Sequence, residues 1–187
     1  HGREQGLRPC LGLTRGGQPA YAKGYRMADL NHGTSTRPDT VFDIGSVSKQ
    51  FTCAAVLMLE AEGLLHRDDD IRERLPELAR LPERVTLDQL MRNTAGLPDM
   101  LELLRVGGVG LDQRVDRAQL LQTLARNRHL SFAPGSRFLY CNSGFALLGL
   151  VVERLTGRSL GEFLRERLFA PLGMQATEMA VESDRPL

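Results

Sequence analysis

The feature that most constrains this chain is a helix that is predicted to begin at Ser46. A short apolar run ends at Gly45, and over residues 47–62 apolar side chains cover most of the predicted helix surface. A helix that is apolar on most sides is usually central to a core. Gly63 provides a stop signal at the C-terminal end. We therefore expect the rest of the chain to pack around this helix.

The start of the same helix places a hydroxyl beside an amine. Residues three apart share a helix face, so the Lys49 ammonium can lie next to the Ser46 oxygen. Amide groups at a helix N-terminus favour negative charge, and a serine there with a lysine in reach is a candidate nucleophile. Serine is also a preferred helix cap. Without further motifs, the cap is the more frequent explanation.

Composition argues against several classes of function. The 187 residues are 42% hydrophobic and 25% charged with a net charge of +1, and no stretch concentrates basic residues. Nucleic-acid binding is therefore not indicated. No apolar run approaches the roughly 18 residues of a membrane span. The start carries no signal pattern, which leaves a periplasmic, secreted or cytoplasmic location open.

Cysteine and acidic residues give no sign of a metal site. The three cysteines, Cys10, Cys53 and Cys141, are widely spaced, so neither a zinc site nor a disulfide framework is indicated and we expect them buried and reduced. The acidic run at residues 68–70 lacks the alternating ligands and the glycine of a calcium loop. We interpret it as solvated acids that begin a short helix.

The chain order is strands, then the buried helix, then a long helical section. Strands are expected over residues 9–14 and 20–25 around a Gly-Gly turn, followed by a loop over residues 31–39 and a short strand over residues 40–44. Capping signals and apolar spacing predict further helices near residues 71–75, 86–92, 116–127, 144–155 and 159–169.

A second chemical element lies at Tyr140 and Asn142. The two are two residues apart, so in an extended segment they point to the same side. A phenol with a reference pKa near ~10 is too weak a base at neutral pH, but a nearby lysine ammonium would lower its pKa. Tyr140 could then take the Ser46 proton, and Asn142 could bind Lys49 or a substrate amide.

Ser46-Val47-Ser48-Lys49 together with Tyr140-Cys141-Asn142 resembles the serine β-lactamase and penicillin-binding protein superfamily. The most similar branch is the class C β-lactamase-related group, with D,D-carboxypeptidases, D-aminopeptidases and family VIII carboxylesterases. The similarity covers nearly the whole chain and includes these flanking segments: Asp39-Thr40-Val41-Phe42, Asn93-Thr94-Ala95-Gly96-Leu97-Pro98, Phe132-Ala133-Pro134-Gly135 and Pro171-Leu172-Gly173-Met174.

The resemblance implies a role for each motif residue. Ser46 would be the acylated nucleophile, and its backbone N–H half of an oxyanion hole. Lys49 would be its general-base partner, Tyr140 the second acid/base, and Asn142 a substrate-orienting residue. The resemblance implies no cofactor and no metal. It implies a serine hydrolase that forms an acyl-enzyme with an ester, an amide or a β-lactam.

The implied fold is α+β: an α/β sandwich of the β-lactamase/transpeptidase type with a helical subdomain. Residues 1–70 would supply strands and the nucleophile helix, residues 71–170 the helical part, and residues 171–187 a return segment. The family's third motif, Lys-Thr-Gly or His-x-Gly on a C-terminal strand, does not occur after Asn142. We therefore expect an incomplete sheet, whose open edge invites pairing, and a piece that is inactive by itself.

Two alternatives belong to other classes of function. One is a non-catalytic penicillin sensor or pseudoenzyme, which would bind an acyl group slowly or not at all. The other is a helical interaction domain without a site. This last reading requires Ser46, Lys49 and Tyr140 to lie far apart.

Overall fold

Gly16 and Gly17 reverse the chain, and the residues on either side of them pair as an antiparallel hairpin. The computed structural model describes residues 10–108 and 117–179, and in it β1 (Cys10–Arg15) pairs with β2 (Gln18–Gly24). Both turn glycines have a positive φ, which glycine adopts without strain. The predicted hairpin is confirmed, while residue 9, where it was expected to begin, lies outside the described residues.

A second strand pair corrects the prediction for residues 31–39. β3 (Met27–Asp29) pairs with β4 (Thr34–Ser35), so part of the predicted loop is a strand. Thr34 and Ser35 form a strand because β3 offers a partner, although the residues around them are typical of turns and predict a loop. In this part of the chain each sheet has two strands, so every strand is an edge strand.

Residues 40–44 do not form the predicted strand. The Thr40 hydroxyl accepts a hydrogen bond from the Arg37 amide at 2.8 Å, and the Thr40 amide donates to the Arg37 carbonyl at 3.1 Å. These bonds close a local turn, which competes with strand pairing. The prediction of a strand over residues 40–44 was therefore wrong.

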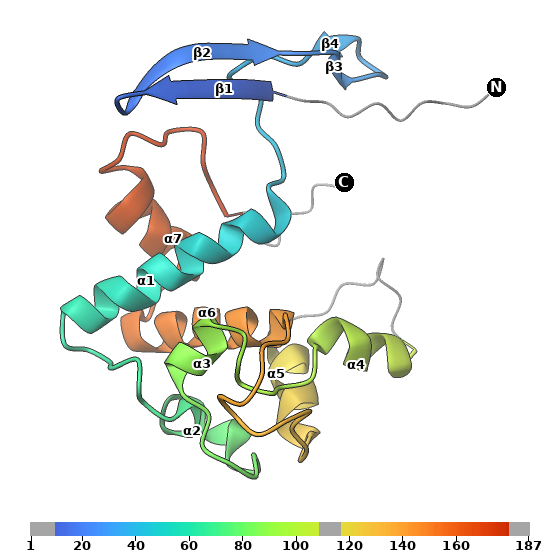
Figure 1. Cartoon of the computed structure of the whole chain (residues 1–187), viewed down its shortest axis with the longest axis vertical. Helices are drawn as coiled ribbons and strands as arrows, with labels where there is room; N and C mark the ends of the chain where they lie inside the picture. Colours follow the sequence, from blue (N-terminus) through green and yellow to red (C-terminus); the bar gives the residue numbers. More distant parts are fainter. Residues whose placement is uncertain (1–9, 109–116, 180–187) are drawn as a thin grey trace. The chain divides into compact units, whose positions relative to one another are not determined.

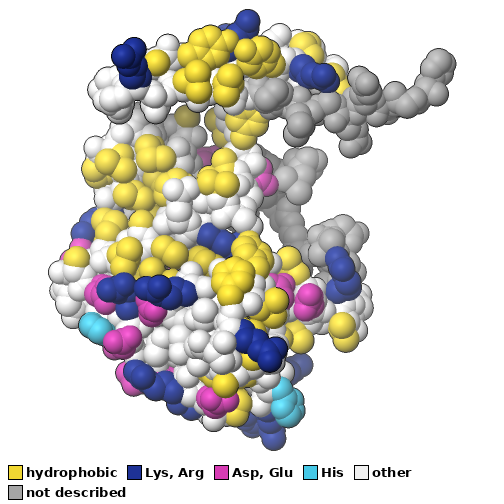
Figure 2. All heavy atoms as spheres, in the orientation of Figure 1, with side chains coloured by type: hydrophobic (Ala, Val, Ile, Leu, Met, Phe, Trp, Pro, Cys, Tyr) yellow, Lys and Arg dark blue, Asp and Glu magenta, His cyan; other side chains and the backbone are white. Residues whose placement is uncertain are grey.

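The chain divides into two compact units, residues His1–Ile44 with the hairpins and residues Gly45–Leu187 with the helices (Figure 1). The boundaries at residues 70 and 170, which were predicted from the sequence, stay predictions. Hydrophobic side chains are exposed on the β1–β2 hairpin (Figure 2), and Leu11, Leu13 and Tyr21 are among them.

The helical unit begins with a short 3-10 turn that contains Ser46. This turn, η1 (Gly45–Ser48), leads directly into α1 (Lys49–Ala61). α1 packs against α6 (Asn142–Thr156), and the two helices share one apolar core. Buried core residues of the two helices include Ala55, Val56, Leu59, Leu147, Leu148 and Val151. The predicted buried helix is confirmed, with its first turn wound more tightly.

Shorter helices surround this pair. They are α2 (Ile71–Arg74), η2 (Pro76–Leu78), α3 (Leu87–Met91), α4 (Met100–Val106), α5 (Arg117–Arg126), α7 (Leu160–Leu164) and the π-helical turn η3 (Arg165–Phe169). The capping boxes expected at Thr86 and Ser159 are present. The expected start of α5 at Asp116 lies outside the described residues.

Two helix starts differ from the sequence prediction. α4 was missed, although Asp99 accepts a hydrogen bond from the Leu101 amide and caps it. α6 begins at Asn142 with Cys141 as its N-cap, and Ser143 is not the cap. The Ser143 hydroxyl instead donates to the Pro98 carbonyl at 2.7 Å. A tertiary hydrogen bond therefore replaced the expected local one.

The acidic run at residues 68–70 begins a helix, as predicted, but its last two acids are not solvated. Asp70 is buried, accepts a hydrogen bond from the Arg72 amide as the N-cap of α2, and pairs with the Arg72 guanidinium at 2.5 Å. Asp69 is half-buried and pairs with Arg74. Arginine partners take the place of water around these carboxylates, which burial requires.

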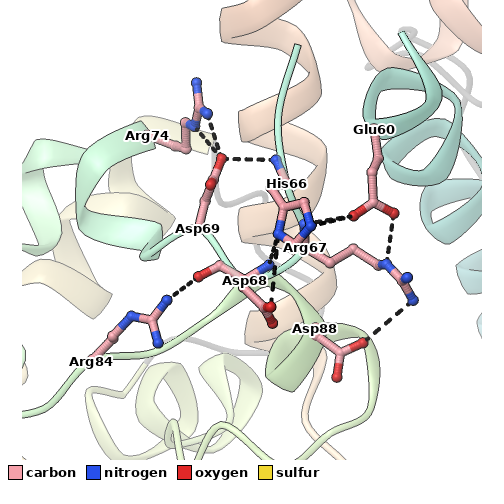
Figure 3. A network of polar contacts seen from close by, with 8 residues as sticks. All are labelled: Glu60, His66, Arg67, Asp68, Asp69, Arg74, Arg84 and Asp88. Atoms are coloured by element: carbon pink, nitrogen blue, oxygen red, sulfur yellow. Dashed lines mark hydrogen bonds and ion pairs between the residues drawn. The ribbon is translucent and has the colours of Figure 1, made fainter. Parts of the chain in front are cut away.

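The same region ties the end of α1 to the next helices. Arg67 donates to Glu60 of α1 at 2.6 Å, and its guanidinium lies 3.9 Å from Asp88 of α3. Figure 3 shows this network of side chains from three consecutive parts of the chain. The charges therefore serve to fix α1 against its neighbours.

The cysteines differ in environment. Cys141 is buried, as predicted, and Cys53 is half-buried, but Cys10 is exposed because it lies in a two-stranded sheet. All three are free thiols. Within the described ranges, none of the helices is long and apolar enough to cross a membrane.

We predict that Gly96→Ala destabilises the helical unit far more than Gly157→Ala. Both glycines have a positive φ, +73° and +67°, which costs another residue about 1–2 kcal/mol. An added Cβ at Gly96 would lie 2.2 Å from the Phe132 carbonyl oxygen, whereas at Gly157 it meets nothing within 4 Å. Overpacking costs a further ~1–3 kcal/mol. Urea-induced unfolding measures the difference, and equal losses would contradict the prediction.

Candidate active site

The Ser46 hydroxyl is the centre of the candidate site. The Tyr140 hydroxyl lies 2.6 Å from Ser46 Oγ, and Lys49 Nζ donates to the same oxygen at 3.0 Å. The Tyr140 oxygen and the Lys49 nitrogen are therefore less than about 6 Å apart, the range in which charges shift a pKa strongly. The structure brings together three residues that are separated by up to 94 positions.

Lys49 lies close to two aromatic rings. Its ammonium is 5.1 Å from the ring centroid of Tyr140 and 5.4 Å from that of Phe145. Both distances fall within the range of a cation–π contact. Phe145 was not identified from the sequence as a site residue. Its position on the first turns of α6, just after the Tyr140 segment, was the one available signal.

The pKa of Tyr140 is lowered from its ordinary value of 10.0. The main cause is hydrogen bonding by the Lys49 ammonium, followed by hydrogen bonding with Ser46. Both favour the phenolate over the phenol. Tyr140 is 45% exposed, so water screens part of this effect. The direction suits a base that takes a proton from Ser46.

The backbone on either side of Tyr140 is held by Asn93. The Leu139 amide donates to the Asn93 carbonyl, and the Cys141 amide donates to Asn93 Oδ1, each at 3.0 Å. Asn93 has φ of +58°, a conformation that asparagine tolerates better than most residues. The buried Cys141 thiol also lies 3.4 Å from the Leu97 carbonyl. The segment at residues 93–98 is thus a scaffold for Tyr140.

Asn142 makes different contacts from those expected. It is the first residue of α6, so the two-residue alternation of an extended segment does not apply to it. Its backbone amide and its side-chain Nδ2 donate to Asp99 Oδ2 at 2.6 and 3.0 Å. Asn142 lies two residues after Tyr140, but its side-chain nitrogen is directed to Asp99. Its role toward a substrate stays a prediction.

The arrangement is suited to moving a proton away from a serine hydroxyl. A hydroxyl hydrogen-bonded to a phenol of lowered pKa, with an ammonium beside both, can lose its proton as it attacks an electrophile. Among the residues that the structure describes, no cluster of three His, Cys, Asp or Glu could hold a metal ion.

The chain was compared with known families and proteins. The family model described as Beta-lactamase matches residues 7–186. A D-aminopeptidase of Cereibacter sphaeroides strain ATCC 17023 is 33% identical over 176 residues, which are 94% of this chain and 33% of that protein. The chain therefore spans about a third of the length of this curated relative.

Solved structures of related proteins share the fold of this chain. The octameric penicillin-binding protein homologue from Pyrococcus abyssi superimposes with a TM-score of 0.73 at 32% identity, over 86% of this chain and 38% of that one. The D-alanine carboxypeptidase AmpC from Burkholderia cenocepacia superimposes with a TM-score of 0.73 at 28% identity, over 89% and 43% of the two chains. The predicted α+β fold is thereby confirmed.

We predict that Lys49→Met raises the pKa of Tyr140 toward about 10, because the ammonium that favours the phenolate is lost. NMR titration of ¹³C-labelled tyrosine measures this, with the resonance assigned by its absence in Tyr140→Phe. Lys23→Met is the matched control, because Lys23 Nζ lies 5.2 Å from the ring centroid of Tyr25, the residue that follows β2. An unchanged Tyr140 titration in Lys49→Met would contradict the assignment.

Proposed function

Because the chain belongs to the β-lactamase family, we propose that it carries the nucleophile half of a serine hydrolase that works through an acyl-enzyme. The single observation that supports this most is the double contact at Ser46 Oγ, with Tyr140 at 2.6 Å and Lys49 at 3.0 Å. A helix cap needs neither partner. The helical interaction domain without a site loses its support, since it required these residues to lie apart.

The proposed reaction begins with proton transfer from Ser46. Tyr140 as the phenolate accepts the hydroxyl proton while Oγ forms a bond to the acyl carbon of the substrate, whose carbonyl oxygen becomes an oxyanion. The bond to the leaving group then breaks, and the leaving group takes the proton from Tyr140. Water repeats the sequence on the Ser46 ester and releases the acid.

The other residues have supporting roles in this proposal. Lys49 keeps a positive charge beside Tyr140 and Ser46, which favours the phenolate and the developing alkoxide. The Ser46 backbone N–H supplies half of the oxyanion hole, where one donor is typically worth about 10²–10³ in rate. Asn142 orients the substrate. The reaction as written uses no cofactor.

We infer that the substrate is a small molecule or a peptide with an amide bond beside a D-amino acid. The names of the relatives, D-aminopeptidase and D-alanine carboxypeptidase, favour this class. An ester or a β-lactam offers the same acyl carbon to Ser46, so each is an outcome that the labelling experiment below distinguishes. A penicillin sensor or pseudoenzyme is the alternative in which acylation is not followed by hydrolysis.

The test uses the full-length protein with a fluorophosphonate probe and a fluorescent penicillin. We expect Ser46→Ala to abolish labelling and to lower hydrolysis of a D-amino acid p-nitroanilide by at least about 10³-fold, as for loss of a serine nucleophile elsewhere. Ser48→Ala is the matched control, because the Ser48 hydroxyl donates to the Gly45 carbonyl at 2.6 Å. It should change the rate by no more than a few-fold.

The form of the label separates the alternatives. A penicillin label that turns over supports a hydrolase, and a stable one supports the sensor. Labelling that persists in Ser46→Ala, or no labelling of the unmodified protein, would overturn the acyl-enzyme proposal altogether.

A further inference from the structure

Asp99 makes contacts that its role as a helix cap does not require. One carboxylate oxygen, Oδ1, accepts a hydrogen bond from the Leu101 amide at 2.9 Å and caps α4. The other, Oδ2, accepts hydrogen bonds from the backbone and side-chain nitrogens of Asn142, at 2.6 and 3.0 Å. A cap is complete with the first of these bonds. Asp99 Oδ2 accepts from both nitrogens of Asn142, a residue 43 positions away in the sequence.

The chemistry of Asp99 fixes the orientation of the Asn142 carboxamide. An ionised carboxylate only accepts hydrogen bonds, whereas a carboxamide has one donor end and one acceptor end. Asn142 must therefore present its nitrogen to Asp99. Its oxygen is the end that Asp99 does not hold, and no residue in the described parts of the chain donates a hydrogen bond to it. Asn142 as a whole is half-buried.

Asp99 also acts on Tyr140 electrostatically. The groups that bear on the Tyr140 hydroxyl are Lys49 of α1, Ser46 of η1 and Asp99 before α4. Lys49 and Ser46 lower the pKa of Tyr140, whereas the negative charge of Asp99 raises it by a smaller amount. Removal of that charge should therefore lower the pKa of Tyr140 further.

We propose that Asp99 is a positioning residue that holds Asn142 with its carboxamide oxygen free to accept a hydrogen bond from an N–H group of the substrate. This inference rests on the proposed hydrolase function and deepens it, because it selects substrates whose acyl part carries an amine or an amide N–H. Simple acyl esters lack that donor and gain nothing from the contact.

Two substitutions separate this role from the cap. Asp99→Asn is isosteric, but its amide has one acceptor oxygen in place of two, so it can accept from Leu101 or from Asn142 but not from both. With its nitrogen turned to Asn142, it no longer holds the nitrogen end of the Asn142 carboxamide. Asp99→Ser keeps a preferred cap for α4 and is too short to reach Asn142 in the same way. Asp70→Asn is the matched control, since Asp70 caps α2 and pairs with Arg72.

The experiment measures kcat and KM of the full-length protein on D-alanine p-nitroanilide, which carries an α-amine, and on p-nitrophenyl butyrate, which has no N–H. We expect both Asp99 variants to raise KM for the anilide, with a loss of about tenfold in kcat/KM, the scale of one hydrogen bond. The ester should change by less than about threefold. Asp70→Asn should leave the ratio between the two substrates unchanged.

A second readout is independent of turnover. In the tyrosine NMR titration, Asp99→Asn should lower the pKa of Tyr140, and the acidic limb of the kcat/KM profile should move to lower pH with it. An unmodified protein that hydrolyses both substrates, with variants that lose both equally or neither, would overturn the role of Asp99 alone. An unmodified protein that hydrolyses neither substrate would overturn the proposed function and this inference together.

Discussion

The hydrogen bonds between residues 93–99 and residues 139–143 are the constraint on which the candidate site depends. Asn93 holds the backbone on both sides of Tyr140, and Asp99 holds the first residue of α6. The Ser143 hydroxyl, which is fully buried, bonds the Pro98 carbonyl between them. Without this junction a phenol 94 positions from Ser46 would have no reason to lie 2.6 Å from its oxygen. The apolar packing of α1 on α6 supplies the second half of the alignment.

Most of the helices, the hairpin and the pairing of Ser46 with Lys49 could be predicted from the sequence, because their signals are local. The apolar run over α1, the Gly-Gly turn of the hairpin and the capping boxes at Thr86 and Ser159 each depend on residues that are close in sequence. The pairing of Ser46 with Lys49 follows from helix spacing in the same way. Tyr140 was placed at Ser46 only through two motifs taken together, since nothing local links them.

What the sequence did not predict depends on tertiary contacts. Ser143 was expected to cap α6, but a carbonyl from a distant loop is its partner. Asp99 and Phe145 were overlooked because a capping acid and an apolar residue in a helix look ordinary until their neighbours are known. The strand predicted over residues 40–44 is absent because this β-favouring run has no partner strand, and the Thr40 side chain closes a turn instead.

The surroundings of Lys49 bear on which group takes the serine proton. The Lys49 ammonium makes cation–π contacts with the rings of Tyr140 and Phe145. An ammonium has no lone pair with which to accept a proton. Tyr140, whose pKa is lowered by that same ammonium, can accept one as the phenolate. In the mechanism that we propose, Tyr140 is therefore the base, and Lys49 supplies electrostatic support instead of acting as the general-base partner that the resemblance implies.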